Sequence, residues 1–160
     1  MINKNVAELL NAQIGHELGA SQQYLAIASY FASQGLDAWG DFFFKQSDEE
    51  RSHALKIVRF LLDTGTPFEA FPALPSHQPH FDSALEVVEK SLSWEQEVTR
   101  SFHKMAEVAL AEKDFTSFQF LQWFIEEQVE EEASIGRLVD LIRSGINLFQ
   151  AEPLLSRDEH

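Results

Sequence analysis

A glutamate and a histidine with the spacing of a ligand pair interrupt an apolar stripe within residues 47–55, S-D-E-E-R-S-H-A-L. Glu50 lies three residues before His53, so on a helix the two side chains share one side. Counted in helical steps, that side also carries Trp39 and Ile57. Burying a charged carboxylate is costly unless a group of opposite charge pairs with it. A bound cation held by a carboxylate oxygen and an imidazole nitrogen would meet this requirement.

Further carboxylates fall at the same height in the other long helical segments. With helix starts near residues 5, 38, 83 and 115, one glutamate lies about twelve residues into each segment, near its midpoint. A midpoint has the same height whichever way a helix runs. The apolar stripes of the segments show which of these polar groups point inward. We therefore expect one buried polar layer, formed by Glu17, Glu50, His53, Glu95, Gln128 and Glu131.

Such a layer requires positive charge. Carboxylates that share a dry environment repel each other, and their pKa values rise. No Lys or Arg lies on the inward stripes, so His53 and Gln128 are the partners that the sequence offers. Each piece alone has an ordinary explanation, because E-x-x-H arises by chance and E-E-Q-V-E-E-E is typical of a solvated face. The coincidence of height and direction in four segments favours a metal site, and its mixed oxygen and nitrogen ligands suit iron.

The elements that position this layer are helices. Helical periodicity covers almost the whole sequence and predicts an all-α fold with four segments, each about 40 Å long at helical rise. Asp37 is the expected N-cap of the second segment, and Ser83 with Glu86 forms a capping box before the third. Thr116 with Gln119 predicts the same device before the fourth segment.

The connections between the segments predict the topology. The first and third connections span a few residues, so their helices are antiparallel neighbours. The second connection, residues 64–80, contains four prolines and reaches more than about 50 Å when extended. This length suits a crossover along the whole bundle. We therefore predict one domain, residues 1–160, with a four-helix bundle and one long crossover between helices 2 and 3.

The C-terminal segment, residues 146–157, predicts a brief fifth helix with an apolar face. A completed four-helix bundle leaves little apolar surface for this segment to cover. We therefore expect its large apolar side chains to pack between subunits. These side chains are Leu148, Phe149, Leu154 and Leu155.

Composition excludes several classes of function. The 160 residues include 26 acidic and 12 basic residues, which gives a net charge of −14. Nucleic acid and anionic membrane are therefore not expected as partners, because binding phosphate needs clustered Lys and Arg. The sequence has no cysteine and hence no disulfide or thiolate site. It has no signal-peptide pattern and no apolar stretch of transmembrane length, so we expect a cytoplasmic protein.

Over nearly its whole length the sequence resembles the ferritin family, and the bacterial non-haem ferritins in particular. The resemblance rests on four motifs. Three of them are H-E-L-G-A-S-Q-Q-Y at 16–24, D-E-E-R-S-H at 48–53 and W-E-Q at 94–96. The most specific is F-L-Q-W-F-I-E-E-Q-V-E-E-E at 120–132. A ferritin-like bundle with a short fifth helix is the fold that this resemblance implies.

The resemblance also implies a ferroxidase centre and the roles of its residues. The first iron site would consist of Glu17, Glu50 and His53. The second would consist of Glu50, which bridges both ions, Glu95 and Glu131. A third site, seen in some bacterial members, would consist of Glu49, Glu127, Glu130 and Glu131. Gln128 would orient a water molecule or the oxidant, and Tyr24 would donate a hydrogen bond to a ligand carboxylate.

The activity implied by the resemblance is oxidation of Fe²⁺ by O₂ or H₂O₂, followed by storage of ferric mineral inside a homo-oligomeric shell. That shell would contain about 24 identical subunits. Haem is not expected. Bacterioferritins, which are similar ferritins that bind haem, have a haem-ligating methionine directly after the glutamate of E-x-x-H, and this chain has Arg51 at that position. Animal ferritins line a threefold entry pore with two carboxylates, and this chain has Phe118 and Leu121 at those positions.

Two alternatives belong to other functional classes. One is a di-iron carboxylate oxidase of the ferritin-like superfamily that acts on an organic substrate and stores no iron. The lack of a second E-x-x-H motif on the fourth segment, where Glu127 is followed by Glu130, argues against it. The other is a structural helical bundle whose acidic layer binds cations incidentally. Measuring the size of the assembled protein separates both alternatives from a storage shell.

Overall fold

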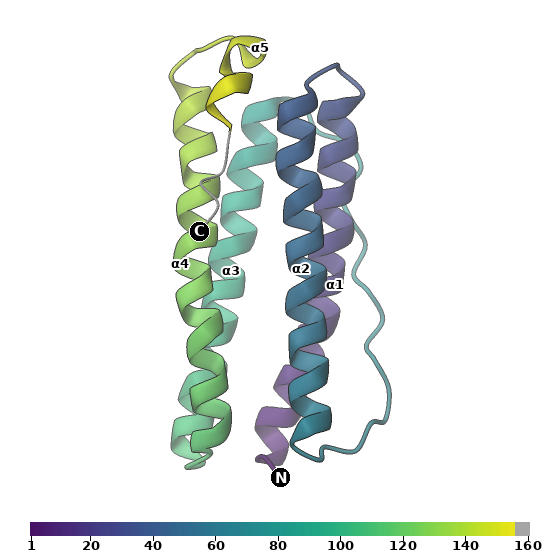
Figure 1. Cartoon of the computed structure of the whole chain (residues 1–160), viewed down its shortest axis with the longest axis vertical. Coiled ribbons are helices and arrows are strands. Elements are labelled where there is room, and N and C mark those ends of the chain that lie inside the picture. The colour runs from purple at the N-terminus through teal and green to yellow at the C-terminus, as the bar shows by residue number, and fades with distance from the viewer. Residues whose placement is uncertain (156–160) are drawn as a thin grey trace.

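Four long helices form the molecule in the computed structural model, which describes residues 1–155, and the two helices of each short connection run antiparallel (Figure 1). A four-residue helix, α5 (Leu148–Ala151), and a 3-10 turn, η1 (Glu152–Leu154), follow them. The described residues contain no strand, which confirms the all-α prediction. The long helices are α1 (Lys4–Ala32), α2 (Asp37–Asp63), α3 (Ala84–Ala111) and α4 (Phe115–Arg143). The predicted fifth segment extends to Arg157, and its last two residues lie outside the described part.

One of the three predicted N-caps is confirmed. Ser83 precedes α3, and its Oγ accepts a hydrogen bond from the Glu86 backbone N–H at 3.1 Å. The prediction for α4 was wrong, because Thr116 lies inside that helix and Asp114 is its N-cap. The Asp114 carboxylate accepts from the Ser117 N–H at 3.0 Å. Its second oxygen accepts from the Asn3 backbone N–H at 2.9 Å, a long-range contact that sequence spacing does not reveal.

The predicted cap of α2 was also wrong. Asp37 is the first residue of the helix, and Leu36 occupies the cap position without a side-chain hydrogen bond. The missing acceptor comes from the other end of the chain, since Glu152 Oε2 accepts from the Trp39 backbone N–H at 3.0 Å. The C-terminal tail, residues 146–155 of the described chain, therefore stabilises the start of α2.

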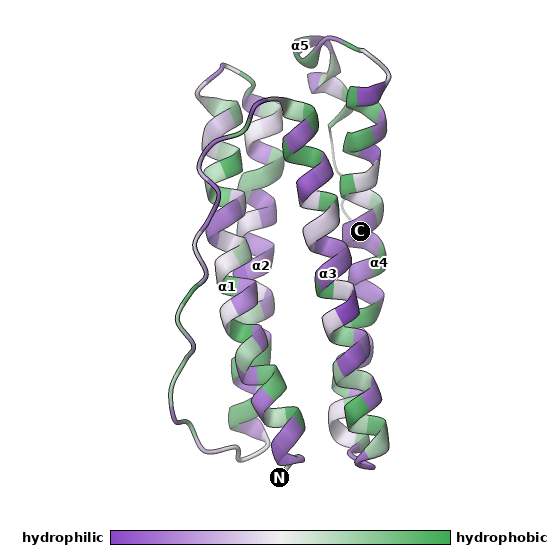
Figure 2. Cartoon of the chain, turned by 180° about the vertical axis from the view of Figure 1, so that it is seen from behind, coloured by the Kyte–Doolittle hydropathy of each residue, from purple (hydrophilic) through white to green (hydrophobic). Residues whose placement is uncertain are grey.

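The crossover runs beside α1 along the height of the bundle, as predicted (Figure 2). Two prolines sit directly on glycines of α1, one turn apart. A Cβ at Gly15 would lie 2.5 Å from Pro72 Cγ, and a Cβ at Gly19 would lie 2.6 Å from Pro75 Cγ. Larger residues at these two positions would push the crossover away from the helix. The crossover is thus a packed part of the fold.

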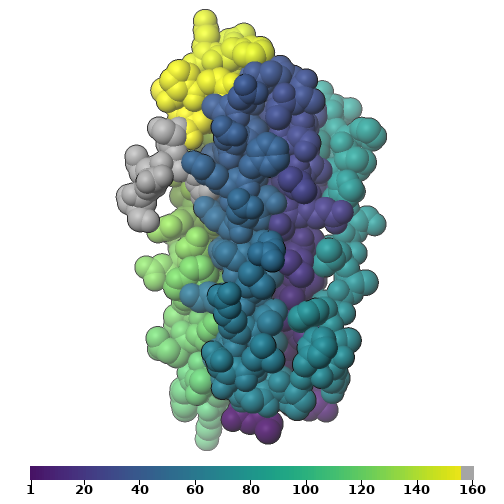
Figure 3. Space-filling view, turned by 45° about the vertical axis from the view of Figure 1, so that its right-hand side comes forward, coloured from purple at the N-terminus to yellow at the C-terminus, as the bar shows by residue number. Residues whose placement is uncertain are grey.

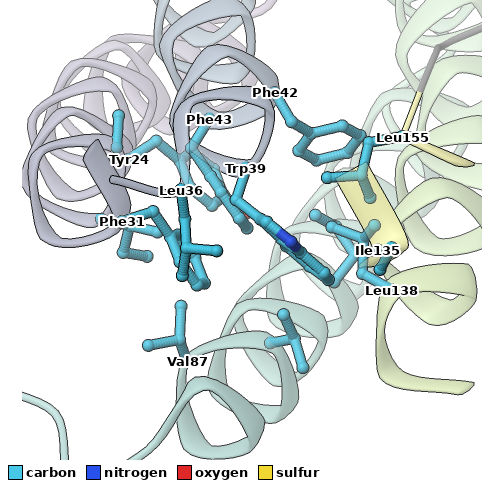
Figure 4. Packing of buried hydrophobic residues seen from close by; sticks show 14 of the residues in the cluster. Tyr24, Phe31, Leu36, Trp39, Phe42, Phe43, Val87, Ile135, Leu138 and Leu155 are labelled. Atoms are coloured by element: carbon cyan, nitrogen blue, oxygen red, sulfur yellow. The ribbon is translucent and has the colours of Figure 1, made fainter. Parts of the chain in front are cut away.

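Two apolar clusters fill the bundle, one toward each end. In the cluster near α5, the Phe31 ring stacks on Trp39 and Phe43, with centroids 5.4 Å and 5.6 Å apart (Figure 4). The other cluster includes Phe102 and Phe124, whose rings stack at 4.6 Å. Between the two clusters lies the polar layer. No helix in residues 1–155 is long and apolar enough to cross a membrane.

The tail differs from the sequence prediction. It lies across the end of the bundle against α2 (Figure 3), where Leu155 is buried and Leu148 packs against the apolar cluster. The Trp39 indole N–H donates to the Leu148 carbonyl at 2.9 Å. The expectation that all four large apolar tail residues lack a place on their own bundle was therefore wrong for these two. Phe149 and Leu154 are 59% and 62% exposed, and their packing between subunits stays a prediction.

Candidate metal centre

The six residues expected to form an inward-facing polar layer are all buried, with exposed fractions of 1% to 3%. Each long helix contributes to the layer because each turns one apolar face inward and places polar residues on that face near the midpoint. The layer comprises Glu17 from α1, Glu50 and His53 from α2, Glu95 from α3, and Gln128 and Glu131 from α4.

Two groups of three side chains in this layer converge closely enough to hold one metal ion each. The ligand atoms of Glu17, Glu50 and His53 lie within 4.8 Å of one another, and so do those of Glu50, Glu95 and Glu131. His53 Nδ1 faces Glu17 Oε2 at 3.8 Å and Glu50 Oε2 at 3.6 Å. Because Glu50 belongs to both groups, the two sites adjoin and share one carboxylate.

A third group lies on the outer side of His53. Its members are His53, Glu127 and Glu131, and the Glu127 Oε1 atom lies 3.9 Å from His53 Nε2. The resemblance implied Glu49 and Glu130 as further members. Glu49 lies near enough that its charge helps to raise the pKa of Glu131, whereas the Glu130 side chain is exposed. The structure therefore brings His53 into the outer group.

Hydrogen bonds fix the α3 carboxylate. The Tyr24 hydroxyl donates to Glu95 Oε1 at 2.5 Å, in line with the expected hydrogen bond to a ligand carboxylate. Gln128 Nε2 donates to Glu95 Oε2 at 3.1 Å and to the Thr99 hydroxyl at 3.3 Å. The Gln128 amide thus orients Glu95. Gln128 was expected from the sequence to orient a water molecule or the oxidant, and this hydrogen bond to Glu95 was not predicted.

Sequence reasoning missed two buried glutamines. Gln13 Nε2 donates to Glu17 Oε1 at 3.2 Å, and Gln46 Nε2 donates to Glu50 Oε1 at 3.2 Å. Gln46 also donates to Glu131, which lies on another helix. Each glutamine precedes a candidate ligand by four residues, which places the pair on one helix face. That spacing was a signal available in the sequence.

Burial and mutual repulsion dominate the electrostatics of the layer. Burial raises the pKa of Glu50 well above its ordinary value, and the negative charge of Glu17 raises it further. Burial likewise raises the pKa of Glu131, with Glu95 adding to the effect. Burial also raises the pKa of Glu95 itself.

Glu17 and His53 shift in the directions expected of an ion pair. Burial raises the pKa of Glu17, but interactions with Glu50 and His53 outweigh this effect and lower it. Burial lowers the pKa of His53, but Glu17 outweighs it and raises the pKa. Glu17 Oε2 is buried and accepts no hydrogen bond from the described residues. A cation bound between these groups would pair with that oxygen and neutralise the layer, so the donor set fits iron.

Comparison with known proteins assigns the family. The Ferritin-like domain model, named Ferritin, matches residues 7–144. The chain belongs to the ferritin family. A bacterial non-heme ferritin of Staphylococcus aureus (strain MRSA252) is 43% identical over 133 residues, which cover 83% of this chain and 80% of that ferritin. The bacterial non-heme ferritin of Staphylococcus haemolyticus is 37% identical over 142 residues, 89% of this chain and 85% of the relative.

Solved ferritin structures show the same fold over the full chain. The open pore ferritin of the hyperthermophilic archaeon Archaeoglobus fulgidus superposes with a TM-score of 0.93 at 34% identity, covering 99% of this chain and 100% of that one. A humanized archaeal ferritin superposes with the same score at 33% identity and covers both chains completely. The predicted ferritin-like fold is therefore confirmed, and the candidate metal centre lies inside the matched region.

Proposed function

We propose that this protein oxidises Fe²⁺ at a two-iron carboxylate centre and stores the ferric product as mineral inside a homo-oligomeric shell. The whole chain, residues 1–160, acts as one ferritin-like domain and works in the cytoplasm. As in other closed symmetric assemblies, identical subunits would enclose the mineral, about 24 of them by analogy with the family. The oxidant is O₂ or H₂O₂.

The observation that carries the proposal is the pair of adjoining ligand groups that share Glu50. In this assignment Glu17, Glu50 and His53 bind the first ferrous ion. The second ion is bound by Glu50, Glu95 and Glu131. Carboxylates suit the task because they bind through one or two oxygens and bridge two ions, and so adapt as the ions gain charge.

The reaction needs two electrons, and two adjacent ferrous ions supply them. Each Fe²⁺ loses one electron, and the pair reduces O₂ with two protons to H₂O₂, or H₂O₂ with two protons to two water molecules. The carboxylates stabilise the additional positive charge on the ferric products. Tyr24 and Gln128 hold Glu95 in place through the hydrogen bonds described above.

The outer group would act after the first pair of ions has reacted. Glu127 and Glu131 contribute to the outer group from α4, and Glu49 lies beside Glu131. A third ion would therefore bind next to the two-iron centre, and it would not be one of the two ions that react first. Glu130 would join the outer site from its exposed position.

Two measurements on the purified protein test the proposal. Light scattering should give a particle of about two dozen 18.2 kDa chains. Adding Fe²⁺ in air should then give a fast absorbance rise followed by a soluble ferric core inside that particle. A monomer or dimer that oxidises iron but precipitates it would reject storage. A shell that does not accelerate oxidation over buffer would reject the ferroxidase assignment.

A further inference from the structure

The bundle consists of two helical hairpins that meet at the polar layer. In Figure 1, α1 lies beside α2 and α3 lies beside α4, and the close backbone contacts fall mainly within these two pairs. At the level of the metal centre, hydrogen bonds link one hairpin to the other. Tyr24 on α1 donates to Glu95 on α3, and Gln46 on α2 donates to Glu131 on α4.

Gln46 is unusual for a glutamine in that its side chain is completely buried. Its single Nε2 atom donates to two carboxylates, Glu50 on its own helix at 3.2 Å and Glu131 across the bundle. Its Oε1 atom is buried and accepts no hydrogen bond from the described residues. Both hydrogen bonds of the amide are thus directed at carboxylates of the proposed second iron site.

A neutral carboxamide in this position suits the charges around it. Glu50 and Glu131 raise each other's electrostatic free energy, because both are buried and acidic. The two N–H bonds of one –NH₂ group can serve one carboxylate each, and such bonds to charged acceptors are stronger than neutral ones. A Lys here would compete with a metal ion for both carboxylates, whereas an amide orients them without adding charge.

We propose that Gln46 is a positioning residue that holds Glu50 and Glu131 in place for the second metal ion. It acts through these two ligands and does not itself bind the ion. The inference rests on the proposed two-ion centre, whose second site Gln46 supports. Without Gln46, the two carboxylates would turn apart. Binding of the second ion would then have to bring them together, which lowers its affinity.

The first site does not depend on Gln46 to the same degree. Of its three ligands only Glu50 accepts from Gln46. Glu17 Oε2 lies 3.8 Å from His53 Nδ1, and Gln13 donates to Glu17. Removing Gln46 should therefore separate the two binding steps. Loss of an outer-layer hydrogen-bond partner commonly weakens metal binding by roughly 10–100-fold. We expect a loss of this size in the second step and little change in the first.

The test uses Zn²⁺, which binds without redox chemistry, and the assembled protein stripped of metal with a chelator. Calorimetric titration should give two strong steps per chain in the wild type. In Gln46→Met, which keeps the side-chain volume, the second step should weaken by at least about ten-fold. Titration with Co²⁺ gives an independent readout, because the visible absorption of the second ion should change while that of the first stays the same.

Ser91→Ala is the matched control. Ser91 is also completely buried and precedes the ligand Glu95 by four residues, but its hydroxyl donates to the Val87 backbone carbonyl. Both Zn²⁺ steps should remain as in the wild type. Gln46→Asn is a second test that keeps a carboxamide in the layer. Its side chain is one methylene shorter and cannot span both carboxylates, so it should show the same selective loss if Gln46→Met does not assemble.

The outcomes separate this inference from the proposed function. A wild type that binds fewer than two Zn²⁺ ions per chain would overturn the two-ion centre and the role of Gln46 together. Two wild-type steps with an unchanged second step in both Gln46 variants would overturn only the role of Gln46. An equal loss in both steps would also overturn it, since that result indicates a general disturbance of the bundle.

Discussion

Replacing Glu50 by Gln should stabilise the metal-free protein while abolishing its activity. Glu50 shares the layer with three other carboxylates, and burial with their charge raises its pKa well above the ordinary value of 4.5. The substitution keeps the shape of the side chain and removes one ionisable group. The new amide can donate to Glu17 Oε2, which now accepts no hydrogen bond from the described residues.

The size of the effect follows from the separation of the charges. Candidate ligand atoms lie within 4.8 Å of one another. Two unit charges at that distance repel by about 3.5 kcal/mol at an effective dielectric constant of about 20. Protonation of Glu50 relieves part of this repulsion in the wild type, so we expect a gain of about 2 kcal/mol. For a chain of this length that gain raises the melting temperature by about 4–8 °C.

Thermal unfolding of the chelator-treated protein, followed by circular dichroism, measures this gain. Because the folded-state pKa of Glu50 is raised, its unfavourable effect is absent below pH 4.5, where both states are protonated; it grows as the pH rises from there to the folded-state pKa and is constant above that pKa. The stability difference between Glu50→Gln and the wild type should therefore be small near pH 4 and larger near pH 8. Saturating Zn²⁺ should reverse the order, because only the wild type has both sites. A metal-free Glu50→Gln protein that melts below the wild type at pH 8 would refute the reasoning.

Three further predictions concern the first iron, the outer group and the tail. His53→Ala should assemble normally yet slow the fast oxidation phase by more than about 10-fold in rapid-mixing absorbance, because the first ion loses a direct ligand and loss of an outer-layer partner alone costs roughly 10–100-fold; oxidation at the wild-type rate would reject this assignment. Glu130→Ala should keep that fast phase and alter the later iron-to-oxidant ratio, measured with an oxygen electrode; an immediate loss of the fast phase would place Glu130 in the inner centre. Glu152→Ala removes the acceptor of the Trp39 N–H and should cost about 1 kcal/mol, or about 2–4 °C in melting temperature, whereas Glu152→Gln, which keeps an acceptor oxygen, should lose less; equal losses in both variants would contradict the capping role.

Much of the fold was predictable because it depends on local periodicity. The four helices begin within about one residue of the predicted starts, since long apolar stripes at helical spacing leave few alternatives. The inward direction of Glu17, Glu50, Glu95 and Glu131 followed from the same stripes. A shared midpoint then sufficed to bring these carboxylates to one level.

What sequence reasoning missed depends on contacts between distant segments. The cap of α2 comes from Glu152, more than a hundred residues later in the chain, so no local pattern could reveal it. Leu155 packs on its own bundle, where it covers the end of the apolar cluster around Trp39 and Phe42 (Figure 4). Such surfaces become visible only when the helices are assembled.

The buried glutamines are a different case. Gln46 lies four residues before Glu50, and this spacing is visible in the sequence. The apolar stripes were used to predict which residues point inward, and they did not single out Gln46. Its bond to Glu131 required knowledge of how α2 and α4 approach each other. The same holds for the placement of His53 beside Glu127, which joins the outer group to the inner one.

The number of ferrous ions oxidised per chain in the first fast phase tests the central claim most directly. Stepwise additions of Fe²⁺ to the assembled metal-free protein, followed by rapid-mixing absorbance, should show a fast phase that grows until two ions per chain have been added and then stops growing. The same titration of Glu50→Ala should show no fast phase from the first addition, because that change removes a ligand from both sites. A fast phase that saturates at one ion per chain, or that survives in Glu50→Ala, would contradict a two-iron centre built around Glu50.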